Sequence, residues 1–384
     1  MNFAQLPEPS SEALAASLSL QNLIRAEIQQ NNGWISFARF MELALYAPQF
    51  GYYTGGSHKI GAAGDFITAP TLSPLFGQTL ARQIAQVLPH TAGNVYEFGA
   101  GTGALASQIL NTLPQDAIQN YYIIELSSEL SERQQQFIAE TAPEMAKKVV
   151  HLRELPEAFD GIIIGNEVLD AMPVELMKQT ADGIRQIGVS WQDEAFVVSE
   201  QEPNNPQLIE LVQQYFPAVA PYTSELHIQQ NAFVQTLAGR LQRGGMIWMD
   251  YGFDATQYYH PQRADGTFIG HYRHHTVHDP FFHIGLTDLT AHVNFTDIAQ
   301  AGCDAGLDLI GYLPQSHFLL NLGITDLLEQ SGEPDSPAYI QAAHTLHKLI
   351  GQHEMGELFK VIAFAKNLDI DWQGFEYGDL CHKL

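Results

Sequence analysis

Residues 94–105 limit the possible folds of this chain more than any other stretch. Their sequence, NVYEFGAGTGAL, predicts a buried strand that runs into a glycine turn and then into a helix. Gly99, Gly101 and Gly103 let the backbone adopt conformations that a Cβ forbids, and let it pass close beside a ligand. We therefore expect an α/β fold that binds a ligand at this turn.

Two classes of cofactor fit such a turn. Gly99, Gly101 and Ala104 match the G-x-G-x-x-A pattern of a dinucleotide site, in which the pyrophosphate rests on a helix N-terminus. Glu97, two residues before the first glycine, would repel a pyrophosphate but suits the positively charged amino-acid half of S-adenosylmethionine. We therefore favour S-adenosylmethionine. An NAD-linked dehydrogenase and a glycine turn without any ligand are the alternatives.

A second acid ends the next predicted strand, at residues 121–125. Glu125 lies 22 residues beyond Gly103, about the distance at which nucleoside-binding α/β folds place the acid that binds the ribose hydroxyls. Ser127 and Ser128 also favour a helix start, so capping of that helix is an alternative role for Glu125. Glu97 and Glu125 together, each at a strand end, predict a nucleoside site more specifically than either acid alone.

Residues 159–173 predict the acceptor side of the site. Their continuous apolar run is typical of a strand buried on both faces of a parallel sheet, and ligands bind beyond the carboxyl ends of such strands. Asn166, Glu167 and Asp170 follow this run, so we expect them to be the catalytic residues. If the acceptor is arginine, its guanidinium calls for carboxylates, which Glu167 and Asp170 supply, with Glu175 as a further candidate.

A third candidate stretch lies at residues 61–70. It contains Gly64, Asp65 and Phe66 between small residues, which suggests backbone that runs close to a ligand. A plain turn before the helix expected at 73–87 explains the same residues, and by themselves they favour that interpretation.

The charge of the chain restricts its partners. Its 384 residues include 18 Lys and Arg against 43 Asp and Glu, a formal net charge of -25. This excess of acid argues against binding to nucleic acid or to an anionic membrane. The same excess of acid favours a cationic partner. Alternatively, its only effect is to keep the protein soluble.

Cysteine usage and the first residues of the chain indicate a compartment. Cys303 and Cys381 are its two cysteines, so a disulfide framework is not expected. The first 24 residues contain no Lys or Arg, which a secretory or mitochondrial leader would need. Apolar runs fall far short of the roughly 20 residues that span a bilayer. We therefore expect a soluble, cytoplasmic protein.

The hydrophobic pattern predicts four segments. They are an N-terminal helical cap (1–70), the first half of a Rossmann-like, mostly parallel core (71–173), an inserted β-meander and helical arm (174–230), and the second half of the core with a substrate-facing loop and C-terminal helices (231–384). Within the last segment, a helix at 231–243 is expected to lead through Gly244 and Gly245 into a strand at 246–252.

Histidines at residues 271–283 raise the question of a metal site. No cysteine accompanies them and no helical H-x-x-x-H spacing occurs, so we expect no metal and instead a polar, aromatic loop that faces the substrate.

With these residues assembled, the chain resembles the class I S-adenosylmethionine-dependent methyltransferases. More closely, it resembles the MidA-like family, which includes a mitochondrial complex I assembly factor that acts as a protein arginine methyltransferase. The likeness covers nearly the whole chain. It is carried by Leu45-Tyr46-Ala47-Pro48 with Gly51-Tyr52-Tyr53, Gly64-Asp65-Phe66, Glu97 through Gly103, Asn166-Glu167 with Asp170 and Pro173, Asp250-Tyr251-Gly252, Gly266-Thr267, and Asp288-Leu289-Thr290 with His292-Val293 and Phe295. At Asn294 the sequence departs from the family, which we expect to carry an acid there more often.

The resemblance implies a class I methyltransferase fold, S-adenosylmethionine as methyl donor, and a protein substrate with a basic segment, arginine being favoured. The expected cofactor-binding residues are Gly64, Asp65, Phe66, Glu97, Gly99, Gly101, Gly103 and Glu125. Asn166, Glu167 and Asp170 are expected to face the acceptor. A small-molecule methyltransferase and a non-catalytic assembly factor remain alternatives, and a homodimer is left open.

Overall fold

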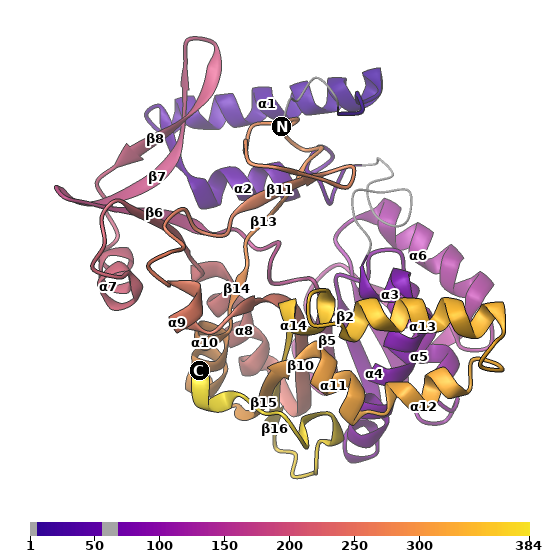
Figure 1. Cartoon of the computed structure of the whole chain (residues 1–384). Helices are drawn as coiled ribbons and strands as arrows, with labels where there is room; N and C mark the ends of the chain where they lie inside the picture. Colours follow the sequence, from indigo (N-terminus) through magenta and orange to yellow (C-terminus); the bar gives the residue numbers. More distant parts are fainter. Residues whose placement is uncertain (1–5, 56–67) are drawn as a thin grey trace. The chain divides into compact units, whose positions relative to one another are not determined.

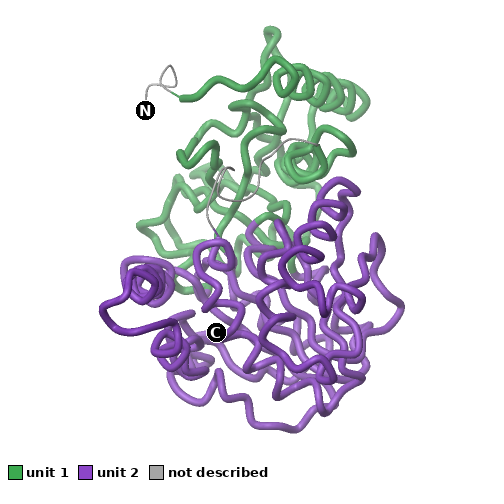
Figure 2. Tube along the Cα trace, turned by 90° about the vertical axis from the view of Figure 1, so that its right-hand side faces the viewer, with its two compact units in different colours: residues 1–66, 171–230, 255–292 green, residues 67–170, 231–254, 293–384 purple. Residues whose placement is uncertain are grey.

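The computed structural model describes residues 6–55 and 68–384 and contains two compact units (Figure 1). Unit 1 comprises residues 1–66, 171–230 and 255–292, and unit 2 comprises residues 67–170, 231–254 and 293–384 (Figure 2). Each unit has a hydrophobic core of its own. The boundaries of these two units differ from those of the four segments expected from the sequence. The main difference is that residues 255–292 belong to unit 1.

Unit 2 is built on an eight-stranded sheet. Seven of its strands follow the order β4, β3, β2, β5, β10, β16, β15, and β14 pairs with the end of β10. Neighbours from β4 to β10 are parallel, whereas β16 is antiparallel to both β10 and β15. The strands are β2 (Asn94–Phe98), β3 (Asn120–Ile124), β4 (Val149–Leu152), β5 (Phe159–Asn166), β10 (Leu241–Phe253), β14 (Val293–Asn294), β15 (Asp308–Pro314) and β16 (Phe359–Lys366). The predicted α/β fold with a mostly parallel, Rossmann-like sheet is confirmed.

Helices cover both faces of this sheet. Val95, Ile162 and Ile247 share one core with α4, α5, α11 and α13. On the other face, Phe98 and Trp248 pack against Phe233 of α8. The helices are α3 (Ala69–Leu72), α4 (Pro74–Val87), α5 (Ala104–Thr112), α6 (Ser128–Thr141), α8 (Ile228–Arg240), α10 (Phe295–Asp304), α11 (Gln315–Asn321), α12 (Ile324–Glu329), α13 (Pro337–Ile350) and α14 (Met355–Leu358). Burial on both faces explains why β5 is apolar throughout its middle.

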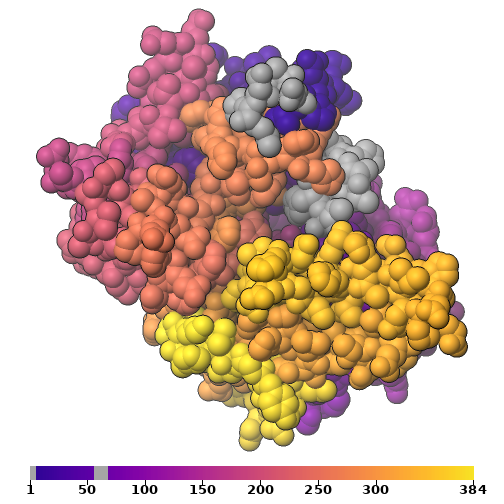
Figure 3. All heavy atoms as spheres, viewed as in Figure 1, coloured from indigo at the N-terminus to yellow at the C-terminus, as the bar shows by residue number. Residues whose placement is uncertain are grey.

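The last segment of the chain completes unit 2. Residues 293–384 supply β14, β15, β16 and the helices α10 to α14, and they form much of the surface of this unit on the side seen in Figure 3. These are the C-terminal helical additions predicted from the sequence.

The sheet has a topological switch point at β2. Strand β2 has β3 on one side and β5 on the other, so the chain leaves these strands in opposite directions. Phe98 pairs with Gly165, so β2 and β5 end at almost the same level of the sheet. Ligands of open α/β sheets bind beyond the carboxyl ends of strands at such a point.

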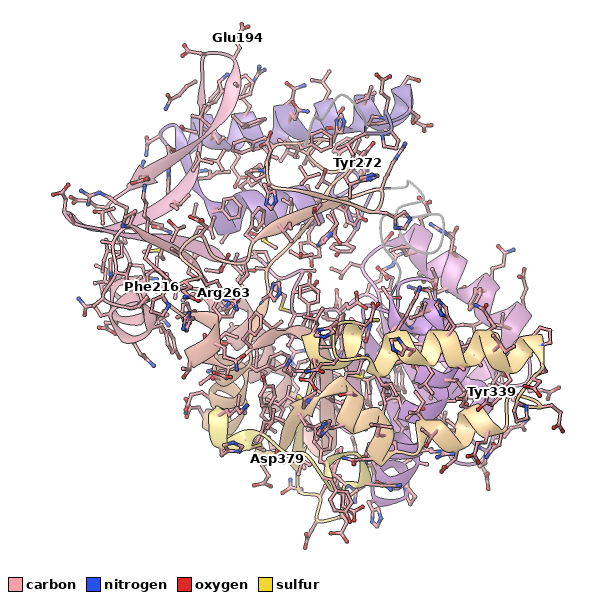
Figure 4. All side chains as sticks on the ribbon, in the orientation of Figure 1. Glu194, Phe216, Arg263, Tyr272, Tyr339 and Asp379 are labelled. Carbon is pink, nitrogen blue, oxygen red and sulfur yellow. The ribbon has the colours of Figure 1, made fainter. Side chains whose placement is uncertain are left out.

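Unit 1 is mostly antiparallel. Its five-stranded sheet has the order β1, β7, β6, β9, with β8 paired to β7, and β12, β11 and β13 form a second sheet. The predicted β-meander is formed by β6 to β8, and Glu194 lies at the tip of the β7–β8 hairpin (Figure 4). The elements are α1 (Ser11–Gln30), β1 (Trp34–Ser36), α2 (Phe37–Tyr46), β6 (Glu175–Thr180), β7 (Gly183–Gln192), β8 (Ala195–Gln201), α7 (Pro206–Tyr215), β9 (Tyr222–Leu226), α9 (Ala255–Tyr258), β11 (Ile269–Tyr272), β12 (His275–Val277) and β13 (Asp288–Thr290).

Glu225 at the end of β9 explains why residues 255–292 belong to unit 1. Its buried carboxylate accepts hydrogen bonds from the backbone N–H groups of Thr267 and Phe268, both at 2.7 Å, and from the Tyr258 hydroxyl at 2.8 Å. A charged acceptor strengthens each of these bonds. The stretch expected to be a loop is therefore fastened to β9, and part of it forms a sheet.

One predicted boundary is wrong. The helix expected at 231–243 ends at Arg240, and Gly244 and Gly245 lie inside β10 rather than before it. A Cβ on Gly244 would lie 1.7 Å from the carbonyl oxygen of Gly161 in β5, so this glycine permits a close approach of two strands. From the sequence the same glycines resembled a turn.

Candidate active site at the carboxyl ends of the central strands

The glycine turn leaves the carboxyl end of β2, as predicted, and α5 begins at Ala104. Gly99, Gly101 and Gly103 have φ values of 64°, 53° and 85°. This left-handed region costs other residues roughly 1–2 kcal/mol each. In addition, a Cβ on Gly99 would lie 2.8 Å from Cγ2 of Val168, in the turn after β5. The backbone therefore favours glycine at all three positions, and at Gly99 the available space requires it as well.

Glu97 lies inside β2 with 1% of its surface exposed. Its carboxylate accepts a hydrogen bond from the Tyr121 hydroxyl at 2.7 Å. Burial raises the pKa of Glu97 to about 7, although the bond from Tyr121 acts in the opposite direction. Near neutral pH this side chain is therefore divided between its two protonation states, and a nearby cation would favour the ionised one.

Glu125 follows β3, and a glutamine joins it to the glycine turn. Its carboxylate accepts hydrogen bonds from the backbone N–H of Ser127 at 2.8 Å and from Nε2 of Gln134 at 3.1 Å. Nε2 of the buried Gln134 also donates to the carbonyl of Gly101 at 3.0 Å. Ser127 is the cap of α6, since its hydroxyl accepts the N–H of Leu130. Burial raises the pKa of Glu125.

The predicted acceptor residues form a strained turn at the end of β5. Glu167 has a φ of 55°, which is unusual for a glutamate, and its N–H donates to the carbonyl of Met249 in β10 at 2.9 Å. Nδ2 of Asn166 donates to Oε1 of Glu167 at 2.9 Å, so the amide orients the carboxylate. Strain of this kind persists where the surrounding structure enforces it and is concentrated at functional sites.

A third carboxylate supports this turn from β10. Oδ2 of Asp250 accepts hydrogen bonds from three successive backbone N–H groups, those of Val168, Leu169 and Asp170, at 3.1, 2.9 and 3.2 Å. Asp250 is 1% exposed. Burial and the neighbouring carboxyls of Asp170 and Glu167 raise its pKa, while the backbone N–H groups oppose that shift.

The structure thus places the candidate donor and acceptor residues of unit 2 at one edge of its sheet. The glycine turn and the turn after β5 pack directly against each other, because a Cβ added to Gly99 would clash with the side chain of Val168. The assignments of Glu97, the three glycines and Glu125 to the cofactor, and of Asn166, Glu167 and Asp170 to catalysis, remain predictions. Gly64, Asp65 and Phe66 lie outside the described residues.

Glu175 does not join these residues within unit 2. It begins β6 of unit 1, where its carboxylate accepts hydrogen bonds from the Ser36 hydroxyl at 3.3 Å and from Nε2 of Gln186 at 2.9 Å.

Sequence reasoning missed two residues of the site. In the sequence, Asp250 stands out only as part of a family motif, although an acid near the carboxyl end of a predicted strand is the same signal that indicates Glu97 and Glu125. Gln134 carries no such signal. It lies in the middle of α6, and only the packing of that helix brings its amide to Gly101 and Glu125.

Residues 6–55 and 68–384 contain neither a metal site nor a membrane-spanning helix. In this part of the chain, no group of three His, Cys, Asp or Glu side chains is arranged to hold a metal ion. None of the helices described there combines the length and the apolar character needed to cross a membrane.

Comparison with known families gives one match over most of the chain. A family model described as "Putative S-adenosyl-L-methionine-dependent methyltransferase" matches residues 79–313. This range contains the glycine turn, Glu125, the turn after β5 and Asp250.

Similar curated proteins are methyltransferases by name. A Drosophila melanogaster protein, 30% identical over 93% of this chain and 87% of its own length, is named protein arginine methyltransferase NDUFAF7 homolog, mitochondrial. The Danio rerio protein arginine methyltransferase NDUFAF7, mitochondrial, is 29% identical over 85% of this chain and 82% of its own length.

A solved structure is similar over the whole length. It is a crystal structure of a protein from Burkholderia thailandensis bound to S-adenosyl-homocysteine, 46% identical, with a TM-score of 0.95, and the match covers 99% of this chain and 100% of that one. S-adenosyl-homocysteine is what remains of S-adenosylmethionine after methyl transfer, so the similarity supports the cofactor predicted from the sequence.

These names contradict the cytoplasmic location that we expected. The relatives from Drosophila melanogaster, Danio rerio and Homo sapiens are all named as mitochondrial proteins. The expectation used the low cysteine content and the lack of Lys and Arg in the first 24 residues, and neither property specifies a compartment. The comparisons also give no support to the homodimer left open above.

Proposed function

This chain belongs to the family of S-adenosyl-L-methionine-dependent methyltransferases whose model it matches, and on that premise we propose that it methylates arginine side chains of a protein substrate with a basic segment. The curated relatives are protein arginine methyltransferases by name, which supports arginine as the acceptor. The formal charge of -25 is suited to attracting a basic segment.

The observation that carries the proposal is the group of three carboxylates at one strand end. Glu167, Asp170 and Asp250 lie close enough for the first two to affect the pKa of the third, and their turn lies beside the glycine turn. Concentrated negative charge in a partly buried place favours a cation. A guanidinium is always charged, and its five N–H groups match carboxylates in a fork arrangement.

The residues present fit the cofactor. The left-handed glycines make a cradle that side chains would fill, Glu97 would hold the ammonium of the amino-acid half, and Glu125 would hold the ribose hydroxyls. When bound, S-adenosylmethionine supplies an electrophilic methyl group next to a positive charge that disappears on transfer.

The protein's own contribution is to orient the acceptor. The Glu167 carboxylate, itself held by the Asn166 amide, accepts hydrogen bonds from the guanidinium and directs one nitrogen toward the donor. Asp170 adds a second negative group on the same turn and takes part in binding the guanidinium.

Labelled methyl transfer tests the proposal. We expect purified protein with methyl-labelled S-adenosylmethionine to label proteins of a cell extract, and acid hydrolysis to return the label as methylarginine. A basic peptide with arginine should be labelled, and the same peptide with lysine in its place should not. Label that passes a low-cutoff filter would identify a small-molecule methyltransferase, and donor binding without any transfer would identify a non-catalytic protein.

Donor affinity should depend on the protonation of Glu97. Because burial raises its pKa to about 7, the side chain is mostly neutral at pH 6 and mostly ionised at pH 8. If the ionised form binds the donor's ammonium, the Kd for S-adenosylmethionine should fall about tenfold from pH 6 to pH 8. Calorimetric titration at several pH values measures this change.

Glu97→Gln is the matched control, and it should bind weakly with little pH dependence. Stability should change in the opposite direction to affinity. The folded pKa lies above the unfolded value of 4.5, so the unfolded chain loses its proton first and the unliganded protein should lose stability as pH rises from 4.5 through 7. Equal pH dependence of the Kd in both proteins would remove Glu97 from the donor site.

A further inference from the structure

We propose that Asp250 is a positioning residue of the methyl transfer reaction, which fixes Glu167 and Asp170 by holding the backbone that carries them. This inference rests on the proposed function, because it concerns the placement of residues assigned to that reaction. Asp250 itself is buried and is assigned no contact with substrate or donor.

The parallel strands β5 and β10 are paired up to the start of the turn. Asn166 of β5 is paired with Met249 of β10, and the N–H of Glu167 still donates to the carbonyl of Met249 at 2.9 Å. Beyond this point the chain after β5 leaves the sheet, so its next amides have no strand to bind. Asp250 is the next residue of β10, at the position where these amides need an acceptor.

One oxygen of Asp250 satisfies three amides in succession. Oδ2 accepts the N–H groups of Val168, Leu169 and Asp170 within 2.9–3.2 Å, and Oδ1 accepts the N–H of Tyr251 at 2.9 Å. Successive N–H groups that converge in this way form a concave anion site, here occupied by a side chain of the same unit. Both carboxylate oxygens are therefore used to shape the backbone.

The turn needs such an anchor because it is strained. Glu167 adopts a φ of 55°, which a glutamate takes up only when its neighbours enforce it. The hydrogen bonds from the N–H groups of residues 168–170 to Asp250 hold the backbone after Glu167 in this conformation. The Asn166 amide holds the Glu167 carboxylate. A relaxed turn would move the carboxylate of Glu167 away from the position in which the Asn166 amide holds it.

Asp250→Asn tests this role. The amide keeps the shape of the side chain but replaces one of the two accepting oxygens with an N–H₂ group, which is then directed against a backbone N–H. With a displaced acceptor, kcat should fall about 100-fold, the size of effect that a 1 Å misplacement produces. The Kd for S-adenosyl-homocysteine should stay within about threefold of wild type, because the glycine turn and Glu125 are untouched.

Asp160→Asn provides the matched control. Asp160 lies at the opposite end of β5, about 20 Å from Asn166, where it accepts the N–H of Ala92 at 2.7 Å and pairs with Arg243. Asp160→Asn also removes a charge and an oxygen that accepts a backbone N–H. It therefore reproduces the loss of stability expected of Asp250→Asn, but it leaves the turn that carries Glu167 and Asp170 in place. Its kcat should remain within about twofold of wild type, with calorimetric stoichiometry giving the folded fraction of each variant.

Hydrogen exchange supplies a readout that is independent of activity. In the wild type, amides 168–170 should exchange as slowly as those inside β5 although they lie outside the strand, and in Asp250→Asn they should exchange at least tenfold faster. Fast exchange in the wild type would overturn the inference even if the variant fails to fold. A kcat for Asp250→Asn equal to that of Asp160→Asn would also overturn the inference. If the wild type transfers no methyl group to protein, the proposed function fails instead, and the exchange result still decides whether Asp250 anchors the turn.

Discussion

Glu167→Gln is expected to reduce methyl transfer to protein by about 10²–10³-fold, the effect of removing one preorganised electrostatic group from a site. Glutamine preserves the size of the side chain and its bond from Asn166, but it cannot offer a negative charge to a guanidinium. Donor binding should be unaffected, because Glu167 follows β5 and the predicted donor residues follow β2 and β3. Single-turnover transfer and calorimetry with S-adenosyl-homocysteine measure the two quantities separately.

Glu157→Gln is the control for charge. Glu157 is exposed and precedes β5 at the strand's other end, so its replacement removes one negative charge from the chain, as Glu167→Gln does. Transfer should continue at the wild-type rate. If both variants transfer methyl groups at that rate, the acceptor residues lie elsewhere.

Glu167→Gly separates function from stability at the same position. Glycine adopts a φ of 55° without the strain of roughly 1–2 kcal/mol that a side chain incurs, although its greater freedom in the unfolded chain offsets part of this gain. We expect the thermal midpoint to be kept or raised while transfer is lost. A lower midpoint would show that the Glu167 side chain contributes to folding.

Gly101→Val is expected to abolish donor binding, with a Kd at least 100-fold above the wild-type value. Gly101 has a φ of 53°, and a β-branched residue is a genuine outlier in that region. The carbonyl of Gly101 is also the acceptor for Gln134, whose amide reaches Glu125, so a shifted turn disturbs both halves of the predicted donor site. Titration with S-adenosylmethionine and with S-adenosyl-homocysteine measures the loss.

Gly306→Val is the control for backbone strain. Gly306 belongs to the same unit, has a φ of 82°, and has no heavy atom within 4 Å of an added Cβ among the described residues. Both variants should lose stability by similar amounts, but Gly306→Val should still bind the donor. Normal titration of Gly101→Val would contradict the assignment of the glycine turn to the cofactor.

Most of the central sheet was predictable because its signals are local. The strand expected at 121–125 is β3, shifted by one residue, and the helix expected at 73–87 is α4, one residue shorter. A buried parallel strand must be apolar along its length, and the turn beyond it must tolerate a ligand, so both properties are visible in a short window of sequence. The same reasoning correctly placed Glu97, Glu125 and Glu167 at strand ends.

The errors arise where distant segments meet. Gly244 and Gly245 were interpreted as a turn, whereas Gly244 in fact allows β10 to approach Gly161 of β5. The histidine-rich stretch was expected to be a loop, but part of it forms β11 and β12. Gly161 lies 83 residues before Gly244, and β11 pairs with β13 as well as with β12, so in each case a deciding partner lies outside the stretch and no periodicity within it reveals the contact.

The sequence by itself determined the class of fold, the glycine turn and the identity of the acids at the carboxyl ends of β2, β3 and β5, because backbone freedom, burial and strand ends are encoded by neighbouring residues. The tertiary structure decided how these acids are used. It buried Glu97 beside Tyr121 and so raised its pKa, it joined Glu125 to Gly101 through Gln134, and it brought Asp250 under three amides of another strand's turn. Burial and hydrogen-bond geometry depend on the register and packing of segments far apart in the chain, and for that reason only the folded molecule specifies them.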